Sequence, residues 1–429
     1  MSRKPLIFLL LACLTLQTGC VLFHDRASLP ESSVQSVYEP EQSSSPEPES
    51  SESEPEPESE SSLSEPEQES VSERFTGDAA AALGEYLSQN GLYGRKLSLL
   101  PSGELLVSAF GADGAETLLR CDARGGISED GTALTFDQTL ALALGHIPVL
   151  IDAEKRELQT LGADGAAMLT VSLPPLEDVH PAELEQAAQR LIAVAPDGSR
   201  LAYFTGTEYR LHVEKLDTGE SEEVTTAVAE LLSSDGIRSV IPAGIECGGF
   251  EFRSLRFLNS RFLAAEFLVS GSAPAVSVYL FIDSVTGEVP HCEAGDYTFV
   301  YGGDRCFLLT NLSMTGAYQT EGHAVISAET KDGALLLERC GVEALYAVCS
   351  ANGDYLLLLE PDAGDGKLRF SVLDAASMET VRSFSADKTA GLQSYYDVTA
   401  ALSNDGETAV VTGWNSGGQD ILLFGPDQG

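Results

Sequence analysis

The residues best suited to chemistry are the histidines of the folded part, His146, His180, His212, His291 and His323. A histidine can take a proton from a serine when an acid orients its ring, so each could belong to a hydrolytic triad assembled in space. The sequence has no Gly-x-Ser-x-Gly turn and no His-Glu-x-x-His segment, the local patterns of a nucleophile or a zinc site. We therefore expect surface or partly buried histidines and no catalytic set.

Two other segments could hold a ligand. Residues Asp362 to Gly366 (Asp-Ala-Gly-Asp-Gly) resemble a calcium-binding loop, but they lack the alternating ligands and distal glutamate of an EF-hand. A hairpin turn explains them better. Trp414 could present an aromatic ring to a carbohydrate or a peptide, or it could pack. No Cys/His spacing predicts a metal site, and no cofactor is expected.

The cysteines beyond the leader are Cys121, Cys247, Cys292, Cys306, Cys340 and Cys349. Six cysteines in an exported chain permit up to three disulfides. However, Cys306 and Cys349 lie in apolar strands, where a free thiol packs as a small hydrophobic group. We expect mostly free thiols, with at most one bridge.

The start of the chain predicts export and lipid attachment. Arg3 and Lys4 precede an apolar run, Leu6 to Leu16, and Gln17-Thr18-Gly19-Cys20 follows it. The run is too short and too quickly polar for a helix that stays in the bilayer. Small residues before a cysteine resemble the bacterial lipobox, although Gln17 stands where leucine is usual. The resemblance implies that residues 1–19 are a signal peptide and that Cys20 carries the lipid; an ordinary signal with a chance cysteine is the alternative.

Residues 20–74 predict a disordered tether. Fourteen glutamates and no Lys or Arg lie between Arg26 and Arg74, and serine and proline fill most of the rest. Such a stretch has little apolar surface to bury, and its like charges repel. A spacer of this length suits a thick cell wall, which favours a Gram-positive-type envelope. We expect the protein at the outer face of the cell membrane, anchored through Cys20.

The rest of the chain, residues 75–429, is also acidic. Beyond residue 73 there are 22 Lys and Arg against 51 Asp and Glu, a formal net charge of −29. Phosphate binding needs clustered cations, so nucleic acid is excluded as a partner. An acidic surface of this kind is typical of a soluble part outside the cell.

A repeat in this part predicts its fold. Hydrophobic stretches broken by a tight turn recur around Gly103, Gly198, Gly353 and Gly406, and the last two steps between turns are 50 residues (from Gly303) and 53 residues. An apolar strand ending in Asp follows each of the first three turns, as in Leu216-Asp217-Thr218-Gly219-Glu220. Four short strands at this period are typical of propeller blades.

The turn and strand pattern resembles the TolB-like and WD40-like β-propellers over most of residues 95–429. We predict an all-β propeller of seven blades, with six or eight as alternatives, starting near residues 95, 138, 190, 250, 296, 344 and 396. Leu356 to Leu359 should fill layers between blades. The last strand, Ile421 to Phe424, should join a blade begun by N-terminal residues and close the ring.

Three helices are predicted beside the strands. The first runs from Ala79 to Leu87 with Asp78 as its N-cap, the second from Pro181 to Arg190, and the third from Thr225 to Leu232. They either frame a binding surface or cover apolar edges.

Two function classes remain open. The first is a non-catalytic propeller that binds or scaffolds an extracellular protein, peptide or glycan. The alternative is an extracellular hydrolase or lyase that acts on a polymer through carboxylates at the channel mouth. Convergent carboxylates with a histidine at one channel mouth would favour the enzyme, and a flat or apolar face with no convergent polar groups would favour the binding module.

Overall fold

The computed structural model describes residues 74–152, 154–173, 183–216, 220–224, 226–271, 276–303, 305–311, 323–389, 392, 398–415 and 418–425. The chain divides into the units Met1–Gln68 and Glu69–Gly429, and every described residue belongs to the second. The predicted signal peptide, Cys20 and the tether up to residue 73 lie outside the described residues. None of the helices among the described residues has the length and apolar character needed to cross a membrane.

Seven antiparallel sheets follow one another along the chain, each made of strands consecutive in sequence. The first sheet holds β1 (Tyr93–Leu99), β2 (Leu105–Phe110), β3 (Glu116–Cys121) and β4 (Ile127–Glu129). The second holds β5 (Val149–Asp152), β6 (Glu157–Leu161) and β7 (Ala167–Ser172). The third holds β8 (Ile192–Val194), β9 (Arg200–Thr205), β10 (Arg210–Lys215) and β11 (Ser221–Val224). The fourth holds β12 (Gly249–Phe257), β13 (Phe262–Ser270), β14 (Ser277–Asp283) and β15 (His291–Ala294).

The remaining sheets follow the same pattern. The fifth holds β16 (Asp296–Gly302), β17 (Arg305–Asn311), β18 (His323–Lys331) and β19 (Ala334–Ala344). The sixth holds β20 (Tyr346–Cys349), β21 (Tyr355–Leu359), β22 (Lys367–Asp374) and β23 (Thr380–Asp387). The seventh holds β24 (Val398–Leu402), β25 (Ala409–Asn415) and β26 (Gly418–Phe424).

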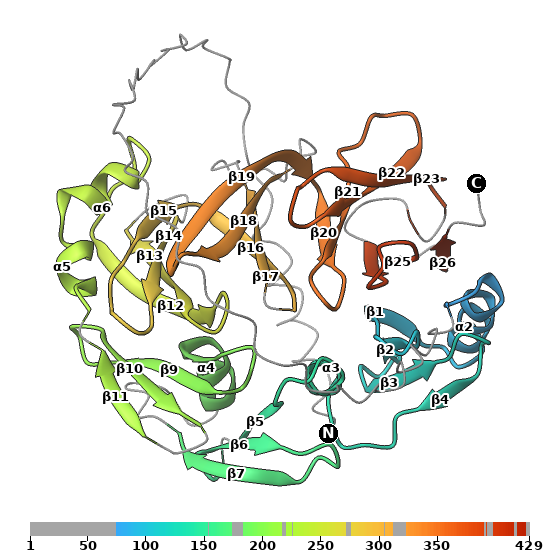
Figure 1. Cartoon of the computed structure of the whole chain (residues 1–429), viewed down its shortest axis with the longest axis horizontal. Helices are drawn as coiled ribbons and strands as arrows, with labels where there is room; N and C mark the ends of the chain where they lie inside the picture. Colours follow the sequence, from blue (N-terminus) through green and yellow to red (C-terminus); the bar gives the residue numbers. More distant parts are fainter. Residues whose placement is uncertain are drawn as a thin grey trace, which may run out of the picture. The chain divides into compact units, whose positions relative to one another are not determined.

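The sheets of this unit surround a common centre, with outer strands such as β7 and β11 at the periphery (Figure 1). The seven-bladed β-propeller predicted from the repeat is therefore confirmed, and six of the seven predicted blade starts fall within a few residues of a first strand. The second blade differs. Its predicted start near residue 138 lies in helix α3 (Phe136–Ala143), and its strands begin only at Val149.

The tight turn after β8 depends on a glycine with positive φ and on an aspartate side chain that accepts a backbone amide. Between β8 and β9, the Gly198 amide donates to the Ala195 carbonyl at 2.8 Å, and Gly198 has φ = +66°. Asp197 Oδ1 accepts the Ser199 amide at 3.0 Å. The turn also leaves no room for a side chain, since a Cβ on Gly198 would lie 2.5 Å from the Ile147 Cβ. The segment before β5 therefore lies against the turn after β8.

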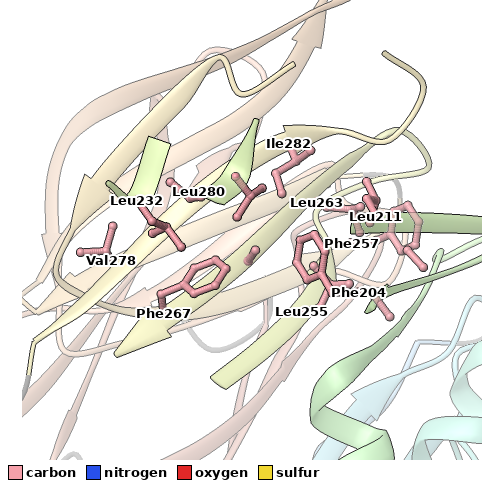
Figure 2. Close-up of a cluster of buried hydrophobic side chains, with 14 of the residues drawn as sticks. Phe204, Leu211, Leu232, Leu255, Phe257, Leu263, Phe267, Val278, Leu280 and Ile282 are labelled. Atoms are coloured by element: carbon pink, nitrogen blue, oxygen red, sulfur yellow. The ribbon is translucent and has the colours of Figure 1, made fainter. Parts of the chain in front are cut away.

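The core consists of apolar layers between neighbouring sheets. Leu356 and Leu358 pack toward the fifth sheet, whereas Leu357 and Leu359 pack toward the seventh, as the alternation of a strand requires. All four side chains are buried, which confirms the predicted interblade role. Figure 2 shows the largest layer, between the third and fourth sheets, where Phe204 of β9 meets Phe267 of β13.

Within the described residues, five helices accompany the sheets: α2 (Gly77–Gln89), α3, α4 (Leu184–Leu191), α5 (Val228–Leu232) and α6 (Asp235–Val240). The predicted N-cap Asp78 is wrong. Thr76 caps α2, because its hydroxyl accepts the Ala79 amide at 3.2 Å and its extended backbone precedes the first turn. The predicted helix at 225–232 is confirmed only from Val228, and α3 and α6 were not predicted.

The predicted closure of the ring is wrong. β26 pairs with β25 in a three-stranded sheet, and within the described residues no N-terminal strand joins it. Helix α2 packs beside β26 instead, and Leu83 of α2 shares a buried cluster with β1, β2 and the seventh sheet. A helix can take this place because its apolar face covers the exposed sheet without pairing its edge.

The described cysteines are all free thiols, so none of them forms the single bridge that the sequence left open. Burial, with a smaller contribution from the Asp122 charge, raises the pKa of Cys121 to about 12. Burial also raises the pKa of Cys349 to about 12, although the nearby Arg305 opposes it. These thiols therefore pack as neutral hydrophobic groups.

Candidate pocket at the channel mouth

A pocket of about 390 Å³ lies where the inner strands of the third, fourth and fifth sheets end. Helices α3 and α4, which Figure 1 places toward the middle of the ring, supply the rest of its wall. The lining residues are Leu140, Leu144, His146, Gln189, Ile192, Ala193, Val194, Pro196, Leu255, Arg256, Phe257, Tyr301, Gly302 and Gly303. Most of them are apolar, and Arg256 is the only Lys, Arg, Asp or Glu among these described residues.

A β-bulge in β12 sets the direction of Arg256. The pairing of β12 with β13 shifts between Phe252 and Ser254, so Arg253 is an extra residue in the ladder. Phe252, before the bulge, packs against the cluster between the third and fourth sheets. Leu255 and Phe257, after the bulge, belong to that cluster (Figure 2). Since strand side chains alternate, Arg256 points to the opposite side.

The guanidinium of Arg256 rests on an aromatic stack. Its central carbon lies 4.6 Å from the centre of the Phe299 ring, and that ring stacks on Tyr301 with centroids 6.5 Å apart and planes 14° apart. The Tyr301 hydroxyl donates to the Phe257 carbonyl at 3.0 Å. Burial of this hydroxyl raises the pKa of Tyr301 well above its usual range, so Tyr301 stays neutral at physiological pH. The stack fixes the position of the charge.

The pocket is suited to binding and poorly suited to acid–base chemistry. Among the described residues, no carboxylate lines it, so this part of the chain does not provide the pair of acids that glycosidic chemistry requires. Within the part of the chain that the structure describes, no group of three or more His, Cys, Asp or Glu side chains could hold a metal ion. An apolar wall with one fixed cation instead favours a ligand that has an apolar part and a negative group.

The predicted histidines do not come together. His146 lines the pocket, whereas His212 lies on β10 with Nε2 at 2.8 Å from the Thr205 hydroxyl. The Nε2 atom of His291 lies 2.9 Å from the Leu335 carbonyl oxygen. His180 and the side chain of His323 lie outside the described residues. Among the described histidines, none is hydrogen-bonded to both a serine and an acid.

The two other candidates from the sequence are the segment from Asp362 to Gly366 and Trp414. Asp362 to Gly366 form the turn between β21 and β22, and basic side chains occupy both carboxylates. Lys388 Nζ lies 2.5 Å from Asp362, and Arg369 pairs with Asp365. The predicted hairpin is therefore confirmed. The side chain of Trp414 lies outside the described residues.

A larger hollow of about 1,100 Å³ lies beside α5, between the third and fourth sheets. Four glutamates line it, and its one basic side chain, Arg210, is paired with Glu208 at 2.9 Å and Glu223 at 3.8 Å. All of these side chains are well exposed to water. Charged side chains that are exposed to water contribute little free energy to binding, so the smaller pocket is the better candidate.

The sequence analysis did not single out Arg256, Phe299 or Tyr301. The available signal was a charged residue between two buried hydrophobic residues in Leu255-Arg256-Phe257. That signal places Arg256 opposite the core, but it does not show which aromatic side chains lie beside it. Phe299 and Tyr301 come from the next blade, some 40 residues later, and only the folded ring brings them to Arg256.

Comparisons with known proteins assign no family to this chain. No protein-family model matches the chain. No curated protein matches it either. Among solved structures, the chain is similar to the β-propeller domain of Cps50 (Swd1) from Myceliophteria thermophila, at 11% identity and a TM-score of 0.40, covering 77% of this chain and 96% of that one.

Two further similar structures have enzymatic names. Oligogalacturonate lyase in complex with manganese matches at 12% identity and a TM-score of 0.39, covering 78% of this chain and 90% of that one. Acylaminoacyl peptidase of Pyrococcus horikoshii matches at 14% identity and a TM-score of 0.33, covering 65% and 42%. The chain thus corresponds to less than half of that peptidase. At these identities the likeness does not transfer an activity to this chain.

Proposed function

We propose that the protein is an extracytoplasmic lipoprotein whose propeller binds a protein, peptide or glycan at the pocket around Arg256. The lipid on Cys20 holds it at the outer face of the cell membrane, and residues 20–74 act as the spacer. The observation that carries the binding function is the described pocket lining, which combines aliphatic walls with one fixed guanidinium and includes no carboxylate among the described residues. The anchor rests on the leader and on the Gly19-Cys20 pair.

The binding function is tested by capture from intact cells. The full chain carrying Cys20→Ala, and therefore soluble, is used as bait with and without Arg256→Glu. We expect one stoichiometric ligand, and we expect the Arg256→Glu bait to lose it. Arg238→Glu is the matched control, because Arg238 is an exposed arginine on α6 and does not line the pocket. Unchanged capture by the Arg256→Glu bait, or turnover of wall polysaccharide by the soluble chain, would reject the proposal.

The anchor is tested by replacing each leader cysteine separately. Cys20→Ala should abolish labelling by a radioactive fatty acid and release the protein from the membrane. Cys13→Ala should change neither, because Cys13 lies inside the apolar run and is removed with the signal peptide. Full labelling and retention of the Cys20→Ala protein would show that Cys20 is not the lipidated residue.

A further inference from the structure

Arg256 is a charge that the fold leaves available. In a chain with a formal net charge of −41, carboxylates are abundant, yet none of the described ion pairs includes Arg256. The residue is exposed, whereas its neighbours Leu255 and Phe257 are each only 3% exposed. A solvated arginine at a random surface position would have many conformations. Here, the contact with Phe299 restricts them.

The pocket that Arg256 lines also has an aliphatic wall. Leu144, Ile192 and Val194 contribute aliphatic surface to the same pocket. Such a wall lowers the local polarity and strengthens the attraction between a guanidinium and an anion. It also gives favourable contact with an aliphatic group next to that anion.

The pocket offers groups that suit a peptide better than a fatty acid. Gln189 can donate and accept hydrogen bonds, and His146 can do either according to its tautomer. A peptide end has amides that match such groups, whereas an alkyl chain has none. The volume of about 390 Å³ is near the lower limit of ligand pockets, which suits a short chain end.

The geometry points to the free carboxyl end of a peptide whose last side chain is aliphatic as the ligand of this pocket. The carboxylate accepts hydrogen bonds from the Arg256 guanidinium, and the last side chain lies against Leu144, Ile192 and Val194. This inference rests on the proposed binding function and specifies its ligand. Arginine suits the role because its planar donors match the two oxygens of a carboxylate.

The test uses the full chain carrying Cys20→Ala and a fluorescein-labelled hexapeptide that ends in Val-Leu. Its free-acid form is compared with its C-terminal amide by fluorescence anisotropy. We expect the amide to bind at least tenfold more weakly. Arg256→Gln should reduce the affinity for the free acid to that for the amide and should leave the amide unaffected. Arg238→Gln is the control that keeps the full difference. Thermal unfolding of each variant shows whether it is folded.

Each contrary outcome has one meaning. Equal affinity for acid and amide would overturn the carboxylate role, while loss of cellular capture with Arg256→Glu would still support the pocket. Tighter, Arg256-dependent binding of laurate than of the peptide would replace the peptide by a fatty acid. If the peptide does not bind in either form, the inference fails. If Arg256→Glu also leaves cellular capture intact, the proposed function fails with it.

Discussion

The guanidinium of Arg256 lies 4.6 Å from the ring centre of Phe299, a residue of the neighbouring blade. This contact couples the position of a charge in the fourth sheet to a side chain of the fifth. None of the described ion pairs includes Arg256, so within the described residues the charge is held without being neutralised. A ligand can therefore meet a cation whose direction is already fixed, which reduces the entropy lost on binding.

The first prediction is that Phe299 acts as a positioning residue. Phe299→Leu should weaken binding of the free-acid hexapeptide about three- to tenfold, because a cation–π contact contributes roughly 0.5–1.5 kcal/mol at a partly exposed site. Phe299→Tyr keeps an aromatic face and should restore most of the affinity. Binding of the amide should stay the same in both variants. An equal loss for acid and amide would indicate general damage to the pocket and would contradict the prediction.

The second prediction concerns the packing of turns between blades. Gly353 has φ = +80°, and a Cβ there would lie 2.1 Å from the Gly302 carbonyl oxygen of the fifth sheet. Gly364 has φ = +77° but nothing within 4 Å of its Cβ position. Gly364→Ala should cost about 1 kcal/mol from the backbone alone, whereas Gly353→Ala should cost more than about 3 kcal/mol.

Urea unfolding of the two glycine variants measures this difference. The comparison isolates the clash because the φ angles of the two glycines are nearly equal. Similar free energies of unfolding for the two variants would show that the fifth and sixth blades can separate at this turn without cost.

The third prediction is a pH dependence at the turn after β14. Arg261 makes a forked contact with Asp283, with Nε at 3.1 Å from both carboxylate oxygens and Nη2 at 2.6 Å from Oδ2. Burial of Asp283 alone would raise its pKa, but the Arg261 contact and the Val285 amide outweigh burial and lower it. A carboxyl group whose pKa is lower in the folded state than in the unfolded state stabilises the protein at pH values above its unfolded-state pKa. This stabilisation is lost as the pH falls through the folded-state pKa.

Arg261→Ala should therefore lower the free energy of unfolding at pH 7, and its difference from the parent should shrink below about pH 4. Lys155→Ala is the control, because the Lys155–Asp152 pair is a solvent-exposed contact within one turn. Urea unfolding between pH 3 and pH 7 gives the comparison. A difference that stays constant over this range would assign the effect to lost packing of the arginine stem and not to the charge pair.

Much of the fold is readable from the sequence, because the blades repeat. The turn glycines and the following Asp residues recur at regular steps, and each step corresponds to one sheet. The second blade was the weakest in sequence and differs most in structure, since α3 occupies the start of its repeat. The spacing between the neighbouring turns leaves room for a second blade. However, hydrophobic periodicity alone does not distinguish a helix from a strand in so short an apolar segment.

The candidate pocket could not be predicted in the same way. Phe250 and Phe252 follow the alternation of a half-buried strand, and continuing it would place Arg256 on the core side. The bulge at Arg253 reverses the alternation, and it depends on pairing with β13. A local pattern carries no signal of such an extra residue. The stack on Phe299 and Tyr301 depends in turn on the packing of two blades.

The way the ring closes leads to the last prediction. Leu83 of α2 is fully buried among residues of β1, β2 and the seventh sheet, and a Cβ on Gly84 would lie 3.8 Å from Ile421 of β26. Helix α2 thus joins the first and last blades through side-chain packing. Leu83→Ala should cost about 3 kcal/mol, the usual range for a fully buried leucine being about 2–5 kcal/mol. Leu336→Ala, at a leucine that is 40% exposed, should cost no more than about 0.5 kcal/mol.

The location of the effect distinguishes closure from general stability. If α2 closes the ring, hydrogen exchange in the Leu83→Ala variant should accelerate first in β1 and β26, while β13 and β14 on the far side keep their protection. The seam opens first because only side-chain contacts, and no ladder of backbone hydrogen bonds, hold α2 to the last sheet. Uniform acceleration across all seven sheets would mean that the ring unfolds as one unit and that α2 has no special role in closing it.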